Sequence, residues 1–223
     1  MTEPSLDGAG LAAALAALAE RDRDIAVALD RFGPPAPRRR PPGFATLLRI
    51  LVAQQLSTRA AAAIWARLER TLGAPVEPAS LHAVDEAVLC ATGLGRRKAA
   101  QARALATAAL NGRLPLEALD RMADEEVVAR IAALPGFGRW SAEIYLLFAL
   151  GRIDVFPADD LALRAGYARL RGIEQRPSPR VLRALVQPWA PFRGAAALVL
   201  WHLHGAATLD AGPSPAATED RAL

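Results

Sequence analysis

The stretch LPGFGRWSAE, from Leu134 to Glu143, sets two glycines in a turn between two apolar segments. Glycine permits positive φ and lets a ligand approach the backbone closely. The amides of Gly136, Gly138 and the first turn of the next helix lack partners within that helix. Together with the helix dipole they form an anion site suited to phosphate, to which Ser141 adds a hydroxyl. A tight corner between two helices, with nothing bound, has the same pattern.

A pair of carboxylates follows in the segment GRIDVFPADDLALRAGYARL, from Gly151 to Leu170. An irregular connection containing Gly151 and Pro157 delivers Asp159 and Asp160 to the start of an amphipathic helix. Capping that helix is the commonest use of Asp at this position, so two in succession suggest that one caps and the other is available. The dipole favours the charged form of such a carboxylate. That form suits stabilising a developing positive charge or orienting a water molecule.

The elements that position these residues are expected to be helical, because Ala, Leu, Arg and Glu dominate and no alternating strand pair is found. The Pro-rich segment GPPAPRRRPPG, from Gly33 to Gly43, is expected to be a non-helical connection. Its arginines either touch DNA or are simply solvated. The stretch from Thr208 onward is expected to be flexible. Helices are predicted at 9–30, 44–54, 57–72, 84–91, 97–110, 123–132, 139–150, 160–171, 178–187 and 193–206.

Composition narrows the classes of protein. The 223 residues suffice for one domain or two interleaved halves. No apolar run reaches the roughly 18 residues of a membrane span, and LAAALAALA lacks the basic lead of a secretory signal, so a cytoplasmic protein is expected. The net charge of +4 fits a nucleic-acid partner and equally an ordinary Arg-rich protein. Because Cys90 is the only cysteine, an internal disulfide and a four-cysteine iron–sulfur cluster are excluded.

The hairpin and the Gly/Pro segment ending in Asp resemble the helix-hairpin-helix (HhH-GPD) DNA glycosylase superfamily, in its DNA-3-methyladenine glycosylase II branch. Three further blocks resemble that family in the same order: Phe44–Leu68, Ala91–Pro115 and Trp189–Leu203. The resemblance implies an all-α fold with two helical lobes around a DNA-binding cleft. One lobe, 44–150, would contain the hairpin. The other would combine 1–43 with 151–207 and carry the catalytic Asp, followed by a flexible tail, 208–223.

Residue roles carry over by position in the matching blocks. Asp160 occupies the place of the family's catalytic Asp, and Trp140 and Trp201 those of aromatic walls around the base; either Trp alone is also explained as a core anchor. The turn at Gln54 and Gln55 would enter the DNA, with Gln55 as the wedge that fills the gap of the flipped nucleotide. Backbone carbonyls of Ala132, Leu134 and Phe137 would hold a monovalent cation such as Na or K. The implied DNA-binding residues are Gln54, Gln55, Ser57, Gly136, Phe137, Gly138, Arg139 and Ser141.

The lysine content bears on mechanism. Glycosylases of the superfamily that also cut the backbone use a lysine amine, usually at the position of Trp140. Here the only lysine, Lys98, lies in the GLGRRK turn, away from that site in the sequence. The resemblance therefore implies simple hydrolysis of the N-glycosidic bond of alkylated bases such as 3-methyladenine and 7-methylguanine, with no lyase activity.

The remaining expectations concern partners and rival functions. The resemblance implies a monomer acting on double-stranded DNA with alkylated bases, associated with the nucleoid and without an organic cofactor, a cluster or a membrane. Three other functions stay open: a glycosylase for another damaged base, a non-catalytic DNA-binding module, and a helical scaffold.

Overall fold

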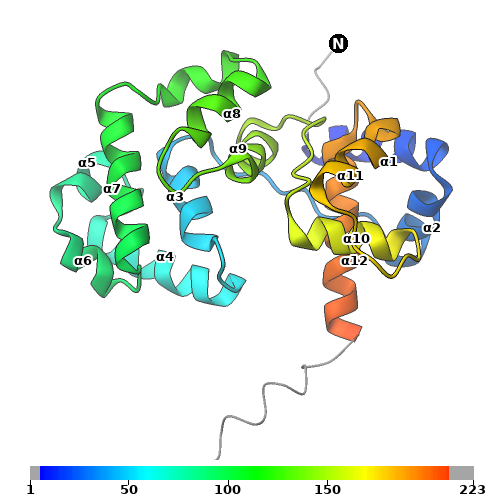
Figure 1. The fold of residues 1–223 in the computed structure, drawn as a ribbon, viewed down its shortest axis with the longest axis horizontal. Helices are drawn as coiled ribbons and strands as arrows, with labels where there is room; N and C mark the ends of the chain where they lie inside the picture. The colour runs from blue at the N-terminus through cyan, green and yellow to red at the C-terminus, as the bar shows by residue number, and fades with distance from the viewer. Residues whose placement is uncertain (1–5, 211–223) are drawn as a thin grey trace, which may run out of the picture. The chain divides into compact units, whose positions relative to one another are not determined.

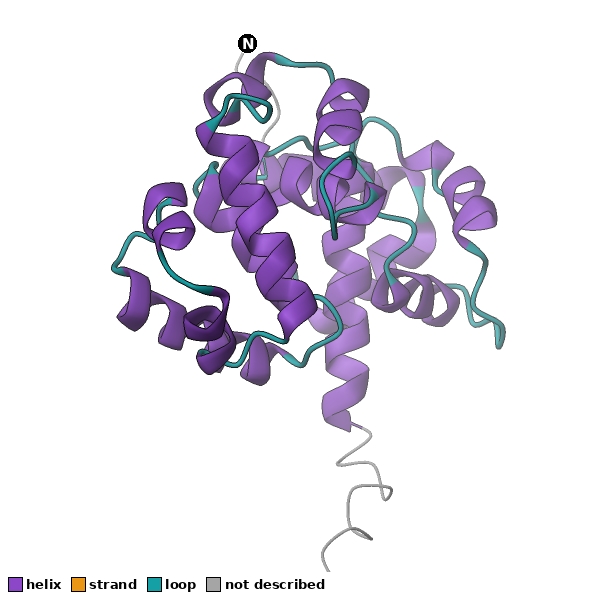
Figure 2. Cartoon of the chain, turned by 60° about the vertical axis from the view of Figure 1, so that its left-hand side comes forward, coloured by secondary structure: helices purple, strands orange, loops and turns teal. Residues whose placement is uncertain are grey.

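The computed structural model describes residues 6–210, and within this range every regular element is a helix (Figures 1 and 2). Contacts divide the chain into two units: residues 38–155, here called the central lobe, and the residues up to 37 with those from 156 onward, here called the terminal lobe. The sequence placed these boundaries at 44 and 150. No helix in the described range is long and apolar enough to cross a bilayer.

The terminal lobe is built from both ends of the described chain. Its apolar residues at helical spacing, among them Leu11, Leu18, Ile25 and Leu163, are buried together. Helix α10 packs along α12. Its elements are α1 (Gly8–Arg21), α2 (Arg23–Phe32), α10 (Leu161–Leu170), α11 (Pro179–Leu185), the 3₁₀ turn η3 (Gln187–Trp189) and α12 (Arg193–Asp210).

The close approach of α10 and α12 depends on Gly166. A methyl group added at this position would lie 2.4 Å from the carbonyl oxygen of Leu200 on α12. Glycine is therefore the residue that lets the two helix backbones meet. Trp201 follows Leu200 directly, and Asp160 precedes the first residue of α10. The packing of the two helices thus brings both site residues into one region.

The single helix predicted at 9–30 is wrong, because the chain breaks at Asp22. This residue adopts extended angles, φ −138° and ψ 107°, and its carboxylate accepts the amides of Asp24 and Ile25 to cap α2. The composition of the segment favours helix on both sides, so propensity alone gave one continuous element. The N-cap with an acidic first turn is the local signal for the break.

The central lobe packs leucines from several helices into one core, including Leu47, Leu51, Leu68 and Leu105, all fully buried. Helix α7 contacts α3, α5 and α6, and α3 also contacts α4 and α9. Its elements are α3 (Phe44–Ala53), α4 (Thr58–Leu72), α5 (Pro78–Ala83), α6 (Glu86–Ala91), α7 (Arg96–Leu110), the 3₁₀ turn η1 (Leu116–Arg121), α8 (Asp124–Ala132), α9 (Arg139–Tyr145) and the π-helical turn η2 (Leu146–Leu150).

Two further sequence-based expectations need correction. The helix predicted at 84–91 is only α6, and a separate α5 precedes it. A capping box between Glu77 and Ser80, with Pro78 in the first turn, begins α5. The predicted tail begins inside α12, which continues through Asp210. The rest of that tail, 211–223, lies outside the described residues.

Candidate active site and nucleic-acid interface

The predicted site residues fall into two groups, one in each lobe. In the terminal lobe, Asp160 and Trp201 are in direct contact although they lie 41 residues apart: the indole Nε1 of Trp201 donates to Asp160 Oδ1 at 3.2 Å. Both side chains are only partly buried. The structure therefore places the predicted catalytic carboxylate beside one of the two predicted aromatic walls.

Asp160 also caps α10. Its Oδ1 accepts the amide of Ala162 at 2.9 Å and that of Leu163 at 3.1 Å. The division of labour between Asp159 and Asp160 is thus different from the one expected, because the predicted catalytic residue is itself the cap. Asp159 instead forms an ion pair with Arg183 of α11. These two amides and the indole of Trp201 are three donors on one carboxylate oxygen, and together they fix the orientation of Asp160.

In the central lobe, α8 and α9 frame the predicted hairpin, and its two glycines differ. Gly136 has a φ of +85°, and a methyl group added there would meet the side chain of Gln101 at 2.4 Å. Its need for glycine therefore comes from packing within the lobe and from the turn. Gly138 has an extended φ of −135°, is exposed, and has open space where a methyl group would stand. Of the two, Gly138 has the more accessible backbone for an external ligand.

The amides of the turn suit an anion. Within residues 6–210, no protein acceptor receives the amide N–H of Gly136 or that of Gly138. The backbone N–H is a strong donor that is normally satisfied. Leu134 O already accepts the amide of Phe137 at 3.1 Å, yet a carbonyl keeps a second lone pair for a cation. The Phe137 side chain itself is buried, so any DNA contact there would use its backbone.

Gln54 joins the hairpin to the end of α3. Its side-chain Nε2 donates to Gly136 O at 2.9 Å and to Ser141 Oγ at 3.1 Å. Ser141 is 2 % exposed, so its hydroxyl faces the interior of the lobe rather than a ligand, against the direction expected from sequence. Both Gln54 and Ser141 act here as internal braces of the turn.

Lys98 of α7 extends this network. Its Nζ donates to Val52 O at 2.8 Å and to Gln54 O at 2.6 Å. The ammonium therefore satisfies carbonyls at the end of α3 that have no partner within the helix. Burial lowers the pKa of Lys98. Through Gln54, Lys98 is linked to the hairpin, a connection that its place in the sequence does not indicate.

Gln55 stands at the tip of the same turn in an unusual conformation. Its φ is +56°, the one positive value for a non-glycine residue in the described range, and its side chain is exposed. Left-handed backbone in a residue with a side chain costs about 1 kcal/mol or more and is retained where the surroundings enforce it. Ser57 follows as the N-cap of α4, where its Oγ accepts the Ala60 amide at 3.2 Å.

Arg139, predicted to bind DNA, is engaged by acidic side chains. Its two terminal nitrogens contact the two carboxylate oxygens of Glu125 at 2.9 and 2.6 Å, and one of them also lies 3.5 Å from Glu143. Hydrogen bonding to Glu125 raises the pKa of Arg139. Glu143 is 4 % exposed, so the guanidinium compensates a buried charge. These contacts indicate that Arg139 stabilises the start of α9 by pairing with Glu125 and Glu143.

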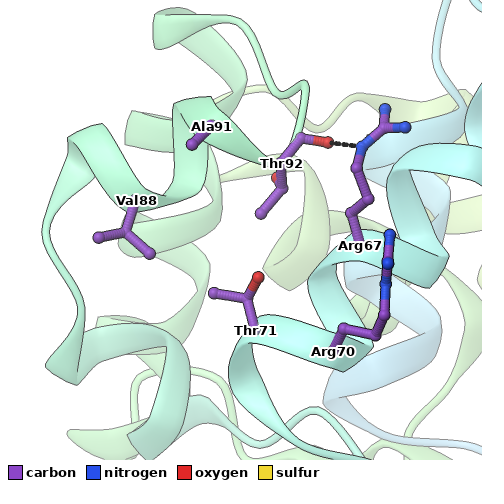
Figure 3. A pocket seen from close by; sticks show the side chains of 6 residues that line it. All are labelled: Arg67, Arg70, Thr71, Val88, Ala91 and Thr92. Carbon is purple, nitrogen blue, oxygen red and sulfur yellow. Dashed lines mark hydrogen bonds between the residues drawn. The ribbon is translucent and has the colours of Figure 1, made fainter.

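Trp140 lines a pocket of about 480 Å³ within the central lobe. The pocket also contains Trp65 of α4 and Phe148, together with three arginines. A second pocket of about 330 Å³ lies between α4 and α6, where Arg67 Nε donates to Thr92 O at 2.6 Å (Figure 3). None of the residues lining this second pocket had been predicted as a site residue, so the aromatic pocket is the one that bears on function.

Sequence reasoning missed the role of Lys98 and the connection through Gln54. The position of Lys98 in the first turn of a helix gave no sign of these contacts, because its acceptors lie 44 and 46 residues away. The remaining signal was its uniqueness among 27 basic residues. Such contacts depend on tertiary packing, which helical periodicity does not encode.

The part of the chain that matches known proteins includes both the hairpin and Asp160. Residues 48–191 match the profile of the HhH-GPD superfamily base excision DNA repair proteins. DNA-3-methyladenine glycosylase 1 of Schizosaccharomyces pombe is 35 % identical over 161 residues, which cover 71 % of this chain and 71 % of that protein. DNA-3-methyladenine glycosylase 2 of Escherichia coli is 29 % identical over 192 residues, which cover 80 % of this chain and 65 % of that protein.

Structural comparison extends the likeness to three dimensions. The 3-methyladenine DNA glycosylase of Schizosaccharomyces pombe, solved in complex with abasic DNA, superimposes with a TM-score of 0.79 at 32 % identity. The match covers 84 % of this chain and 94 % of the solved one. Most of this chain therefore has a counterpart in a solved structure that contains DNA.

Proposed function

Because the chain belongs to the HhH-GPD superfamily of base excision DNA repair proteins, we propose that it hydrolyses the N-glycosidic bond of alkylated bases in DNA. The products are the free base and an abasic site. The observation that carries the proposal is the contact between Asp160 and Trp201 at the start of α10, in a chain similar to proteins named DNA-3-methyladenine glycosylases. The substrates are 3-methyladenine, 7-methylguanine and related adducts.

Asp160 is the catalytic residue of the proposal. Departure of the base leaves an oxocarbenium-like sugar, whose positive charge a carboxylate stabilises while it orients the attacking water. The amides of Ala162 and Leu163 and the indole of Trp201 hold Asp160 Oδ1. Their preorganisation means that the carboxylate needs little reorientation when charge develops.

Trp140 and Trp201 recognise the base. An alkylated base is cationic and electron-poor, so the face of an indole attracts it by stacking and cation–π interaction, worth about 1 kcal/mol. The same positive charge makes the base a good leaving group without strong acid catalysis. Selectivity then rests partly on the lability of the damaged bond and partly on the two rings.

The central lobe holds the DNA backbone in this proposal. The amides of Gly136 and Gly138 bind a phosphate, and the exposed backbone of Gly138 admits it. Gln55, fixed with positive φ at the tip of its turn, fills the space left by the flipped nucleotide, whose extrusion costs a few kcal/mol. The carbonyls of Ala132, Leu134 and Phe137 would hold a monovalent cation, which would add positive charge beside that phosphate.

The enzyme is monofunctional in this proposal and acts as a monomer on double-stranded DNA of the nucleoid. Lyase chemistry requires a lysine nucleophile, and the amine of Lys98 donates to Val52 O and Gln54 O. Borohydride reduction in the presence of abasic DNA should therefore give no covalent adduct. An adduct that forms in the wild type and disappears in Lys98→Met would show lyase activity. The proposal that the enzyme releases alkylated bases would be unaffected by that result.

The main test uses methylated duplex DNA with the wild type, Asp160→Asn and the neighbouring Asp159→Asn. The wild type should release alkylated bases, identified by mass spectrometry, and leave abasic sites. Asp160→Asn should lose at least about 100-fold in rate and keep its affinity for DNA, because asparagine still caps α10. Asp159→Asn, which loses only the pair with Arg183, should remain active.

Two outcomes would overturn the proposal. Release of oxidised, deaminated or mismatched bases in place of alkylated ones would assign the protein to a different glycosylase. Equal behaviour of Asp160→Asn and the wild type, with DNA binding but no base release in either, would indicate a non-catalytic DNA-binding module.

A further inference from the structure

The Pro/Arg connector is attached to the central lobe along its second half. The amide of Arg40 donates to Phe148 O at 2.9 Å, Thr46 Oγ1 donates to Pro41 O at 2.6 Å, and the amide of Gly43 donates to the hydroxyl of Tyr145 at 2.8 Å. These contacts hold the backbone of the connector against α3, α9 and η2. The arginines it carries are therefore displayed from a fixed support rather than from a solvated linker.

Two of these arginines reach the aromatic pocket of the central lobe. Arg38 and Arg40 line it together with Arg49 of α3, and its lining also contains Trp65, Trp140 and Phe148. Arg38 and Arg40 are exposed, and within residues 6–210 their side chains form no ion pair. The pocket thus combines a cationic rim with an aromatic interior.

Within residues 6–210, an acid balances only one of the three arginines of this rim. Arg49 pairs with Glu69 at 3.1 Å and lies over the ring of Trp65, 3.8 Å from its centroid. Burial lowers the pKa of Arg49, Glu69 raises it, and the positive charge of Arg40 lowers it further. Like charges gathered around one hollow favour the entry of an anion, and arginine presents its donors in a fork that matches phosphate.

We propose that Arg38 and Arg40 form a phosphate subsite for the DNA strand, additional to the hairpin, with Trp65 and Arg49 supporting the attached nucleoside. This inference rests on the proposed function in taking DNA as the ligand. A cationic alkylated base would be repelled by these guanidinium groups, so the rim formed by Arg38 and Arg40 holds the anionic backbone, while Trp140 remains the part of the pocket that contacts the base in the proposed function. The connector then serves as a structural part of the DNA interface.

The salt dependence of DNA binding tests this subsite. Each neutralised phosphate contributes a slope of about −0.9 to log K against log salt. In anisotropy titrations with undamaged duplex DNA, Arg38→Ala/Arg40→Ala should reduce the steepness of that slope by about 1.8. The matched control Arg113→Ala/Arg121→Ala removes two exposed charges from the same lobe and should leave the slope near that of the wild type. Circular dichroism checks that each variant is folded.

A second pair of variants separates charge from geometry. Arg38→Lys/Arg40→Lys keeps both charges and loses the planar fork, so the slope should stay near the wild-type value while the affinity falls. An unchanged slope in the alanine double variant, or an equal reduction in the control, would overturn the subsite.

Two further measurements distinguish a DNA strand from a free nucleotide as the ligand, and the subsite from the glycosylase activity. Binding of thymidine 5′-monophosphate as tight as that of a DNA strand, and lost in Arg38→Ala/Arg40→Ala, would assign the pocket to a free nucleotide and refute the assignment to the strand. The titrations require no catalysis. A wild type that releases no alkylated base but shows the predicted change in slope would refute the proposed function alone.

Discussion

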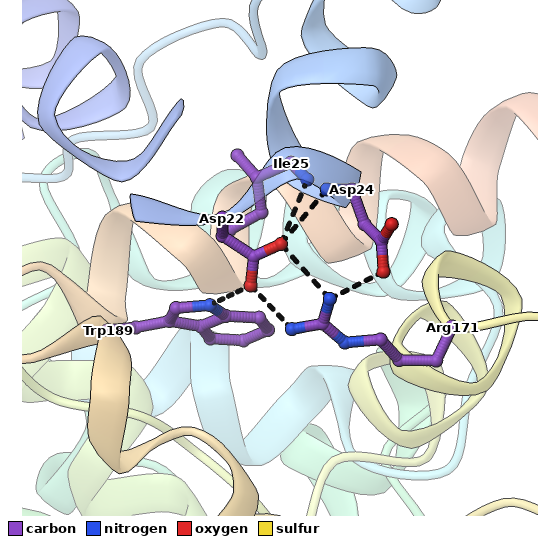
Figure 4. Close-up of polar contacts among 5 residues, drawn as sticks. All are labelled: Asp22, Asp24, Ile25, Arg171 and Trp189. Carbon is purple, nitrogen blue, oxygen red and sulfur yellow. Dashed lines mark hydrogen bonds and ion pairs between the residues drawn. The ribbon is translucent and has the colours of Figure 1, made fainter. Parts of the chain in front are cut away.

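Two aspartates of the terminal lobe repeat one arrangement. Asp22 and Asp160 each precede a helix, accept the amides two and three residues ahead, and accept an indole N–H, from Trp189 at 2.7 Å and from Trp201 at 3.2 Å. At Asp22, both oxygens also contact the guanidinium of Arg171, which reaches Asp24 as well (Figure 4). At Asp160, the indole and both amides converge on the same oxygen, Oδ1.

The difference between them separates a structural brace from a reactive site. The side chain of Asp22 is 10 % exposed and Trp189 is 1 % exposed, so the indole and the arginine lock the first turn of α2 inside the lobe. Asp160 and Trp201 remain partly open to solvent. The same cap is therefore nearly buried at Asp22 and remains partly exposed at Asp160.

The largest expected effect that distinguishes the two sites is on stability. Asp22→Asn should lower the free energy of unfolding by about 3 kcal/mol, because Arg171 loses its main partner in a partly buried position. Asp160→Asn should change it by less than about 0.5 kcal/mol, since asparagine caps as well as aspartate. Urea denaturation measures both. Equal losses would mean that Asp160 is a brace too, and the comparison would fail.

An intermediate effect is expected from the two indoles. Trp189→Phe should cost about 2 kcal/mol, because it leaves a buried cavity and removes a donor to Asp22. Trp201→Phe should cost less than about 1 kcal/mol and should instead slow the release of alkylated bases by about three- to tenfold. Denaturation and base-release assays on both variants give the matched pair of readouts. A stability loss in Trp201→Phe as large as that in Trp189→Phe would identify it as a core anchor.

The smallest expected effect concerns acid. Burial raises the pKa of Asp22, but hydrogen bonds from Arg171 and Trp189 outweigh it and hold the pKa below the ordinary value of 3.8. The carboxylate therefore contributes stability above pH 3.8 that is lost as the pH falls through the lowered pKa. Asp22→Asn should flatten the decline of stability below pH 4, as measured by denaturation across pH. If stability declines as steeply in Asp22→Asn as in the wild type, titration of groups other than Asp22 causes the decline.

The sequence predicts the helical class because Ala and Leu at helical spacing are a local signal. It does not predict the break at Asp22, where helix formers continue on both sides and the cap is closed by Arg171, 149 residues away. The short helix Pro78–Ala83 carried a readable signal in Glu77, Pro78 and Ser80. Its six residues were too few to show a period.

For the candidate site, the sequence likewise predicted residue positions but not their contacts. The positions of Asp160 and Trp201 followed from matching blocks, whereas their contact depends on how α10 meets α12. The glycines of the hairpin looked alike in the sequence, yet Gly136 is required by Gln101 and Gly138 by nothing within the described part of the protein. Tertiary neighbours, which spacing does not reveal, decide which glycine faces a ligand.

Gly166 determines how closely α10 and α12 pack in the terminal lobe. Since one additional methyl group would collide with the Leu200 carbonyl, the separation of α10 and α12 is set by the smallest side chain available, and Trp201 is the next residue along. Any larger side chain at position 166 would push α10 and α12 apart, and with them Asp160 and Trp201. A residue that touches neither the carboxylate nor the indole thus controls the distance between them.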